Sequence, residues 1–172
     1  MKDSKIQILE AQRIHLIHRC ASMELSTLHH SRAEGKWSVI QVLEHIVLSE
    51  EASVSYVFNK TQDLSSLKGI SIKSRVYFIF MKLALKLNMK YKAPKLVNPL
   101  YSESSSLEDL IPRWEATRAR LEDLSKLSPN ILDKGILKHP YIGYLNFSQM
   151  LGFFSSHYAH HLAQINALVE NK

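Results

Sequence analysis

The chain has 172 residues, of which 45% are hydrophobic and 22% charged, a composition typical of a soluble globular protein with one domain over residues 1–172. The formal net charge is +6, and the single cysteine, Cys20, excludes an internal disulfide framework and indicates a reducing compartment. No signal-peptide pattern is present, and the longest apolar run, residues 76–87, is far shorter than the roughly 20 residues that cross a bilayer, so we expect a cytoplasmic protein with no membrane partner.

Helical periodicity runs through the whole sequence, and no strand pattern of useful length interrupts it. Ser38 and Gln41 form a capping-box pattern at the start of one helix, and the acidic residues Glu108 and Asp109 suit the start of another. The predicted helices cover residues 4–29, 38–59, 72–90, 107–127 and 148–170, and residues 129–144 are expected to form a loop. Several long helices in one short chain predict an all-α helical bundle.

A basic stretch lies between Asp63 and Glu103, where the sequence has no acidic residue and its cations exceed the net charge of the whole chain. This excess predicts either a surface that attracts an acidic ligand, nucleic acid or membrane headgroups, or simply a solvated helix face, which we favour. The aromatic residues Tyr77, Phe78 and Phe80 lie inside an apolar run, so we expect them in the core and expect no nucleic-acid partner. The eight cations are Lys68, Lys73, Arg75, Lys82, Lys86, Lys90, Lys92 and Lys95.

Two histidines of the last helix, His157 and His161, are four residues apart and therefore point to the same side of it, with Gln164 one turn further on. Apolar residues surround the pair, so both imidazoles lie in a stripe that is expected to be buried. An unpaired buried polar group costs roughly 1–3 kcal/mol. A shared divalent metal would satisfy both rings, and hydrogen bonds within the core are the alternative. His160 lies at the edge of the stripe.

A catalytic type of metal site needs a third protein ligand from another helix. His45 is the candidate in the second helix, where it lies at one edge of the apolar arc while Glu44 is expected to face water. An edge position of this kind can reach a partner helix. Cys20 lies within the apolar stripe of the first helix, so we expect it in the core and not as a nucleophile.

Two stretches together resemble the DinB/YfiT-like metalloenzymes. Residues 37–46, WSVIQVLEHI, are similar to that family's tryptophan-led second helix, and the second stretch runs from His139-Pro140 through Gly143 and Leu145-Asn146 to the last helix. The resemblance implies a four-helix bundle with an up-down-down-up arrangement, and homodimers are common in the family. It also implies a zinc, nickel or iron ion held by three histidines, here His45, His157 and His161.

The resemblance further implies thiol-dependent S-transfer, since some members use thiols such as bacillithiol or mycothiol. The resulting hypothesis is a metal-activated thiolate that attacks a small electrophilic substrate. A metal-dependent hydrolase is the runner-up, and a non-catalytic dimeric stress or binding protein is the third possibility. Gln164 is predicted to bind a ligand or to orient a histidine, or is simply a polar helix residue, and His139 is predicted to border the pocket.

Overall fold

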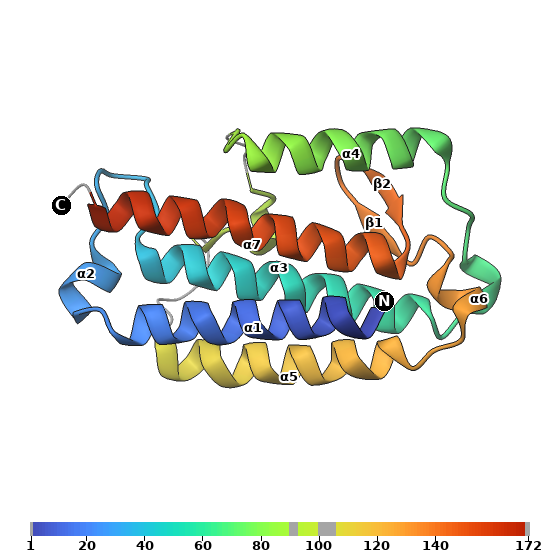
Figure 1. The fold of residues 1–172 in the computed structure, drawn as a ribbon, viewed down its shortest axis with the longest axis horizontal. Coiled ribbons are helices and arrows are strands. Elements are labelled where there is room, and N and C mark those ends of the chain that lie inside the picture. The colour runs from blue at the N-terminus through green and yellow to red at the C-terminus, as the bar shows by residue number, and fades with distance from the viewer. Residues whose placement is uncertain (1, 90–92, 100–105, 171–172) are drawn as a thin grey trace.

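The structure is a computed structural model that describes residues 2–89, 93–99 and 106–170. Its centre is formed by four long helices. In Figure 1, α1 and α7 run in one direction and α3 and α5 in the other, and α3 contacts both α5 and α7. This is the predicted up-down-down-up four-helix bundle, which is therefore confirmed. The four helices are α1 (Lys2–Ala21), α3 (Val39–Lys60), α5 (Leu107–Ser125) and α7 (Phe147–Glu170).

Side-chain caps fix where α3 begins. Ser38 Oγ accepts a hydrogen bond from the backbone N–H of Gln41, and Gln41 Oε1 accepts one from the N–H of Ser38, which completes the predicted capping box. The predicted first helix is wrong in one respect, because it breaks after Ala21 and a short helix, α2 (Leu25–His29), follows. Ser22 Oγ donates to the carbonyl of Arg19 at 2.9 Å, a local bond that competes with continuation of the helix.

Helix α4 (Ile72–Lys86) lies outside the four-helix bundle, along α7. It ends earlier than the predicted boundary at Lys90, a residue outside the described part of the chain. Asn88 adopts a positive φ of 53°, and the N–H of Met89 donates to the carbonyl of Ala84, which is a left-handed helix ending of the Schellman type. The expectation that the aromatic residues of this run are core is wrong for Tyr77 and Phe80, which are exposed.

The segment predicted as a loop over residues 129–144 contains regular structure. A short helix, α6 (Pro129–Leu132), precedes an antiparallel hairpin of β1 (Leu137–His139) and β2 (Gly143–Leu145). Each strand has only three residues, which is too short for an alternating apolar and polar pattern to be visible in the sequence. Gly143 has a φ of +89°, and a Cβ there would lie 2.8 Å from Ser74 Oγ, so this position requires glycine. Two short 3₁₀ helices, η1 (Leu64–Ser66) and η2 (Lys95–Val97), lie in the connections.

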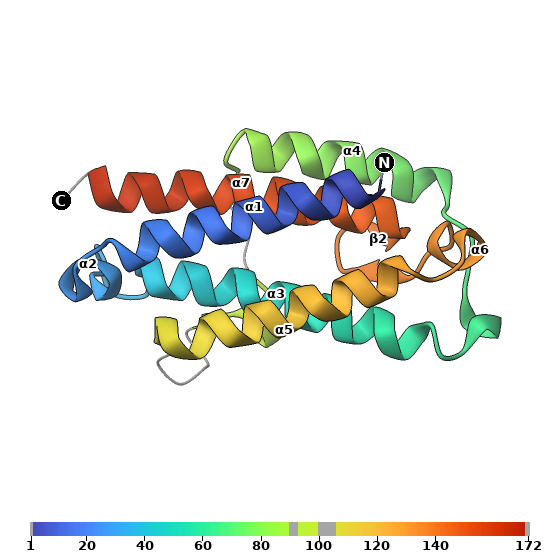
Figure 2. The same ribbon diagram turned by 60° about the horizontal axis from the view of Figure 1, so that its bottom comes forward.

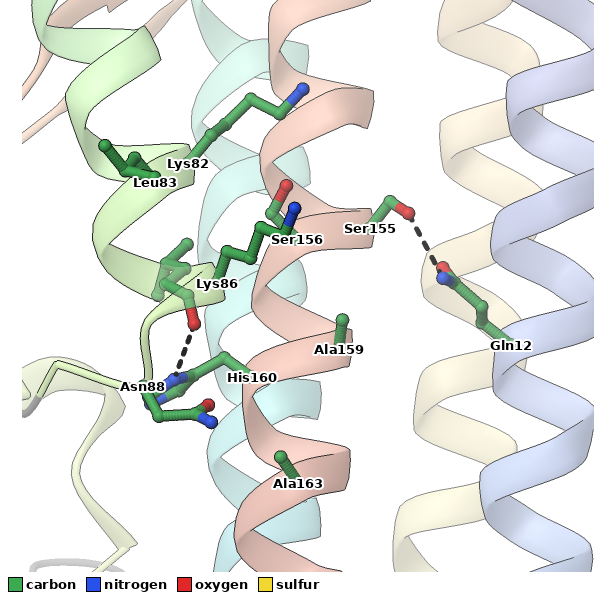
Figure 3. Close-up of a pocket in the computed structure, with 11 residues that line it drawn as sticks. Gln12, Lys82, Leu83, Lys86, Asn88, Ser155, Ser156, Ala159, His160 and Ala163 are labelled. Atoms are coloured by element: carbon green, nitrogen blue, oxygen red, sulfur yellow. Dashed lines mark hydrogen bonds between the residues drawn. The ribbon is translucent and has the colours of Figure 1, made fainter.

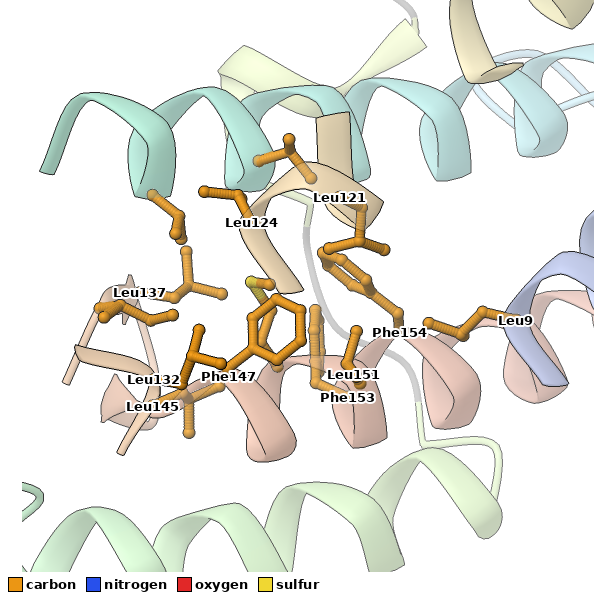
Figure 4. Packing of buried hydrophobic residues seen from close by; sticks show 14 of the residues in the cluster. Leu9, Leu121, Leu124, Leu132, Leu137, Leu145, Phe147, Leu151, Phe153 and Phe154 are labelled. Atoms are coloured by element: carbon orange, nitrogen blue, oxygen red, sulfur yellow. The ribbon is translucent and has the colours of Figure 1, made fainter. Parts of the chain in front are cut away.

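The buried apolar side chains form two clusters along the bundle. One joins α5, α6, the hairpin and the first half of α7, where Phe147 and Phe154 are almost fully buried (Figure 4). The other joins α1, α3, α5 and the second half of α7 around Trp114 and the buried thiol of Cys20. No helix in the part of the chain that the structure describes combines the length and hydropathy needed to cross a membrane.

Candidate metal centre

Three imidazoles meet in the interior between α3 and α7. His45 Nε2 lies 3.1 Å from His157 Nε2, and His161 Nε2 lies 3.0 Å from the same atom. All three side chains are buried, and each offers one nitrogen within 4.8 Å of the other two. The structure therefore brings together the two histidines of the last helix and the histidine of the second helix that the sequence singled out.

Hydrogen bonds at the far side of two rings fix which nitrogen carries the proton. The carbonyl oxygen of Val97 can only accept, so His45 Nδ1–H donates to it at 2.6 Å. In the same way, His161 Nδ1–H donates to Gln164 Oε1 at 2.9 Å. A neutral imidazole protonated at Nδ1 has an unprotonated Nε2, so both rings direct a lone pair at His157.

The three facing nitrogens cannot satisfy one another. His157 Nε2 has at most one hydrogen to give, so at least one of the other two lone pairs lacks a proton donor within the cluster. A buried acceptor without a partner is costly, whereas a cation between the rings would accept all three lone pairs. The N···N distances of 3.0 and 3.1 Å are near the roughly 3.4 Å between ligands of a tetrahedral site with metal–nitrogen bonds of about 2.1 Å. The donor set fits a divalent metal ion.

Burial keeps the three rings neutral. Burial is the main cause of a lowered pKa at each of them. It lowers the pKa of His45, lowers that of His161 to about 3, and holds that of His157 well below its usual value. Repulsion from neighbouring histidines adds to the lowering at all three, whereas the hydrogen bonds of His45 to Val97 and of His161 to Gln164 oppose it. At neutral pH the cluster is thus uncharged, which is the state in which imidazole binds metals.

Aromatic rings cover the cluster. Trp37 lies 4.9 Å from the ring of His45 and 6.5 Å from that of His161, measured between centroids. Phe153 stacks on His157, with 5.3 Å between the ring centroids. The ring of His139 in turn packs edge-on against Phe153, at 4.7 Å. These contacts shield the nitrogens from water and limit rotation of the imidazoles.

Comparisons with known proteins decide the family. The model of the DinB superfamily matches residues 8–165, nearly the whole chain. The chain belongs to the DinB superfamily. Its fold is also similar to the crystal structure of TT2238, a four-helix bundle protein, with a TM-score of 0.60 and 24% identity over 97% of this chain and 99% of that one. No curated protein matches the chain.

The remaining sequence-predicted residues of this DinB-superfamily chain lie at different distances from the histidines. Gln164 contacts His161 directly, and His139 borders the cluster by packing against Phe153, which stacks on His157. His160 hydrogen-bonds the carbonyl of Leu85 through Nδ1, while its ring packs edge-on against that of His161 at 4.9 Å. Glu44, expected to face water, is instead buried, with 2% of its surface exposed. The carbonyl of Val97 was missed, because a backbone oxygen brought in by η2 leaves no signal in the sequence.

A groove of about 530 Å³ lies on a different face of α7, between α1 and α4 (Figure 3). Gln12 Nε2 reaches across it to Ser155 Oγ at 3.1 Å, and Lys82, Lys86 and His160 line it. None of the three clustered histidines contributes to its wall. In this DinB-superfamily protein, the ring of His160 lies between the groove and the candidate metal centre, because it lines the groove and packs against His161.

A second buried polar cluster joins α3 to α5. Glu50 accepts hydrogen bonds from Arg118 Nη2 and from Trp114 Nε1, each at 2.8 Å. Burial raises the pKa of Glu50, against the opposing effects of Arg118 and Trp114. The neighbouring carboxylate, Glu51, points elsewhere and pairs with Arg113. The two glutamates therefore do not form an acid–base pair.

Proposed function

We propose that this protein is a metal-dependent enzyme in which His45, His157 and His161 hold a divalent zinc, nickel or iron ion. The observation that carries the proposal is the convergence of three Nε2 atoms. Two of them, in His45 and His161, carry no proton, because Nδ1 of the same ring donates a hydrogen bond on the opposite side. Three protein ligands leave a position for a further ligand, which is the arrangement of catalytic and not structural sites.

A metal bound there would act as a Lewis acid that lowers the pKa of a thiol or water ligand. The protein's own groups set the conditions for this chemistry. Val97 and Gln164 hold two of the imidazoles in their tautomer and orientation, and Trp37 and Phe153 exclude water. The imidazoles bring no negative charge, so the site favours an anionic partner such as a thiolate.

The reaction that we propose is thiol S-transfer from a low-molecular-weight thiol of the bacillithiol type to a small electrophile. The sulfur forms a bond to the electrophilic carbon, the leaving group departs with the electron pair of its bond, and the thiol proton goes to solvent. The absence of negative charge among the three imidazoles supports a thiolate over a fourth neutral ligand. A cytoplasmic homodimer acting on a small-molecule substrate remains part of this proposal.

Metal content tests the site. Protein purified without a His tag should contain about one zinc, nickel or iron ion per chain, and His161→Ala should lose it. His160→Ala is the matched control, because His160 lies beside His161 on the same helix and packs against its ring, yet it offers no nitrogen to the cluster and bonds the carbonyl of Leu85 instead. Equal metal in both variants, or no metal in the wild type even after zinc or nickel is added, would contradict the proposal.

Turnover tests the reaction. Metal-loaded wild type should consume bacillithiol together with a small alkyl halide, while His161→Ala should be inactive and His160→Ala active. Release of halide without loss of thiol would instead identify a hydrolase. A fully loaded protein that consumes neither substrate would show a binding protein without catalysis.

A further inference from the structure

Helix α4 has an apolar face that the fold does not use. Its inner side packs on the bundle through Phe78, Met81, Ala84 and Leu85. Its outer side is free of other described helices in both Figure 1 and Figure 2. Yet that outer side is also apolar, and its exposed fractions are 81% for Ile72, 42% for Val76, 66% for Ile79, 62% for Phe80, 50% for Leu83 and 64% for Leu87.

These six residues form one continuous stripe, here called the outer stripe. At about 100° per residue they fall within an arc of roughly 100° on the side of α4 away from α7. Scattered apolar residues are ordinary on a protein surface, but a contiguous stripe of large ones marks a site of interaction. Among the described residues nothing covers the outer stripe, so it has the character of an interaction surface.

The charges beside the outer stripe are all positive. On the helical wheel, Lys73 lies at one edge of it and Arg75 at the other, while Lys82 and Lys86 follow Arg75 and extend into the groove beside α7 (Figure 3). Helix α4 contains no acidic residue, and neither does its neighbour α7 before Glu170. The partner must combine an apolar interior with a surface of negative charge.

A second copy of this chain does not meet that requirement at α4. Pairing two α4 helices across a two-fold axis would bring cations towards cations with no carboxylate on either helix. A nucleic acid would neutralise the cations but would leave Ile79, Phe80 and Leu83 in water. A bilayer with anionic lipids satisfies both, because apolar side chains enter the boundary between headgroups and acyl chains while Lys and Arg extend to the phosphates.

We propose that α4 binds in the plane of an anionic phospholipid membrane, with the outer stripe inserted and Lys73 and Arg75 contacting the headgroups. This replaces the sequence-based expectation that the protein has no membrane partner. Tyr77 and Phe80, which the sequence placed in the core, are exposed on this helix. The inference does not depend on the metal centre or on the reaction proposed for it.

Vesicle flotation of the full chain tests the inference. Wild type should float with vesicles of phosphatidylcholine and phosphatidylglycerol and remain below with phosphatidylcholine alone. The variant Ile79→Ser/Phe80→Ser/Leu83→Ser should bind more than about a hundredfold more weakly, because three large apolar groups are lost from the bilayer. The variant Lys73→Gln/Arg75→Gln should bind roughly 25-fold more weakly, since each cation contributes about fivefold.

A matched variant controls for surface hydrophobicity in general. Ile8→Ser/Ile14→Ser/Leu25→Ser removes three exposed apolar residues of α1 and α2, at 52%, 45% and 74% exposure, and should bind vesicles like wild type. All variants should keep the far-ultraviolet circular dichroism and thermal midpoint of wild type, because every changed residue is at the surface. Equal binding by the α4 and control variants would overturn the inference.

Two further measurements separate insertion from other partners. In Phe80→Trp, fluorescence should be quenched by lipids with brominated acyl chains, and vesicle binding without quenching would overturn insertion. Light scattering reports the oligomeric state: a wild-type dimer that the triple serine variant of α4 converts to a monomer would assign the outer stripe to a second copy. Undiminished binding of a DNA duplex by that variant, with no vesicle binding by wild type, would assign the cations to nucleic acid.

Discussion

Helix α3 carries two buried polar side chains, His45 and Glu50, and they face different neighbours. Glu50 faces α5, where each of its carboxylate oxygens accepts a hydrogen bond, one from Arg118 and one from Trp114. His45 faces α7, where its Nε2 meets another ring nitrogen and no complementary charge. Both side chains are almost inaccessible to water, so the difference lies in how their polar atoms are satisfied and not in burial.

This difference separates a structural cluster from a binding site. Each oxygen of the Glu50 carboxylate accepts a hydrogen bond from a protein donor and its charge faces Arg118, so the carboxylate itself needs no further ligand, although Arg118 Nε and Nη1 have no hydrogen-bond partner in the described structure. In the histidine cluster, hydrogen bonds at Nδ1 orient the rings of His45 and His161, but the three Nε2 atoms that face one another lack enough proton donors. Buried polar groups that the protein orients and then leaves unpaired are the ones expected to bind something else.

The largest expected effect comes from breaking the buried pair of Glu50 and Arg118. Arg118→Ala leaves the carboxylate of Glu50 buried without its countercharge, and we expect the free energy of unfolding to fall by about 3–5 kcal/mol. Urea denaturation measures it. The control is Arg113→Ala, whose ion pair with Glu51 is partly exposed, and this variant should lose no more than about 1 kcal/mol. Equal losses would show that the Glu50 cluster is not a tightly coupled buried pair.

Acid should act on the histidine cluster. The pKa of His161 is about 3 in the folded chain, below the value of about 6.5 in an unfolded one, so the unfolded state binds more protons between these values. The stability of the metal-free protein is therefore complete above pH 6.5 and falls as pH decreases, by about 1.4 kcal/mol per pH unit for this residue. Urea denaturation across this range measures it.

His161→Gln provides the control for the acid experiment. Glutamine does not titrate, so the pH dependence of its unfolding free energy should be shallower than that of wild type by about one proton. Identical slopes in the two proteins would mean that His161 is not buried as a neutral ring. The comparison with the Glu50 cluster would then lose its basis.

A smaller effect is expected from the group that orients His161. Gln164→Leu removes the acceptor of the Nδ1 proton and should weaken zinc binding by about 10–100-fold, with little change in stability. Competition with a chromophoric chelator measures the affinity. Asn166→Leu is the matched control on the same helix, because Asn166 Oδ1 is buried without a hydrogen-bond partner in the described structure. Equal affinities in the two variants would remove Gln164 from the metal site.

The two clusters also differ in how far the sequence could predict them. Helical spacing alone predicts that His157 and His161 share one site. The prediction of His45 as the third ligand needed the family resemblance, because the sequence of one helix does not tell which other helix it packs against. The link from Glu50 to Arg118 joins distant segments without a motif, and it was missed. Phe80 shows the opposite error: an apolar run indicates burial, but it does not tell which of two apolar faces the bundle covers.

The smallest effect should come from the cap that begins the shared helix. Ser38→Ala removes the bond to the N–H of Gln41 and should cost about 1 kcal/mol of stability in urea denaturation. Because the loss acts on the first turns of α3, it should loosen His45 and weaken zinc binding slightly while leaving the bonds of Glu50 further along intact. Ser71→Ala removes the corresponding cap of α4 and should leave zinc affinity unchanged. The same affinity in both variants would show that the start of α3 does not position His45, and that its place against α7 is set by packing along the rest of the helix.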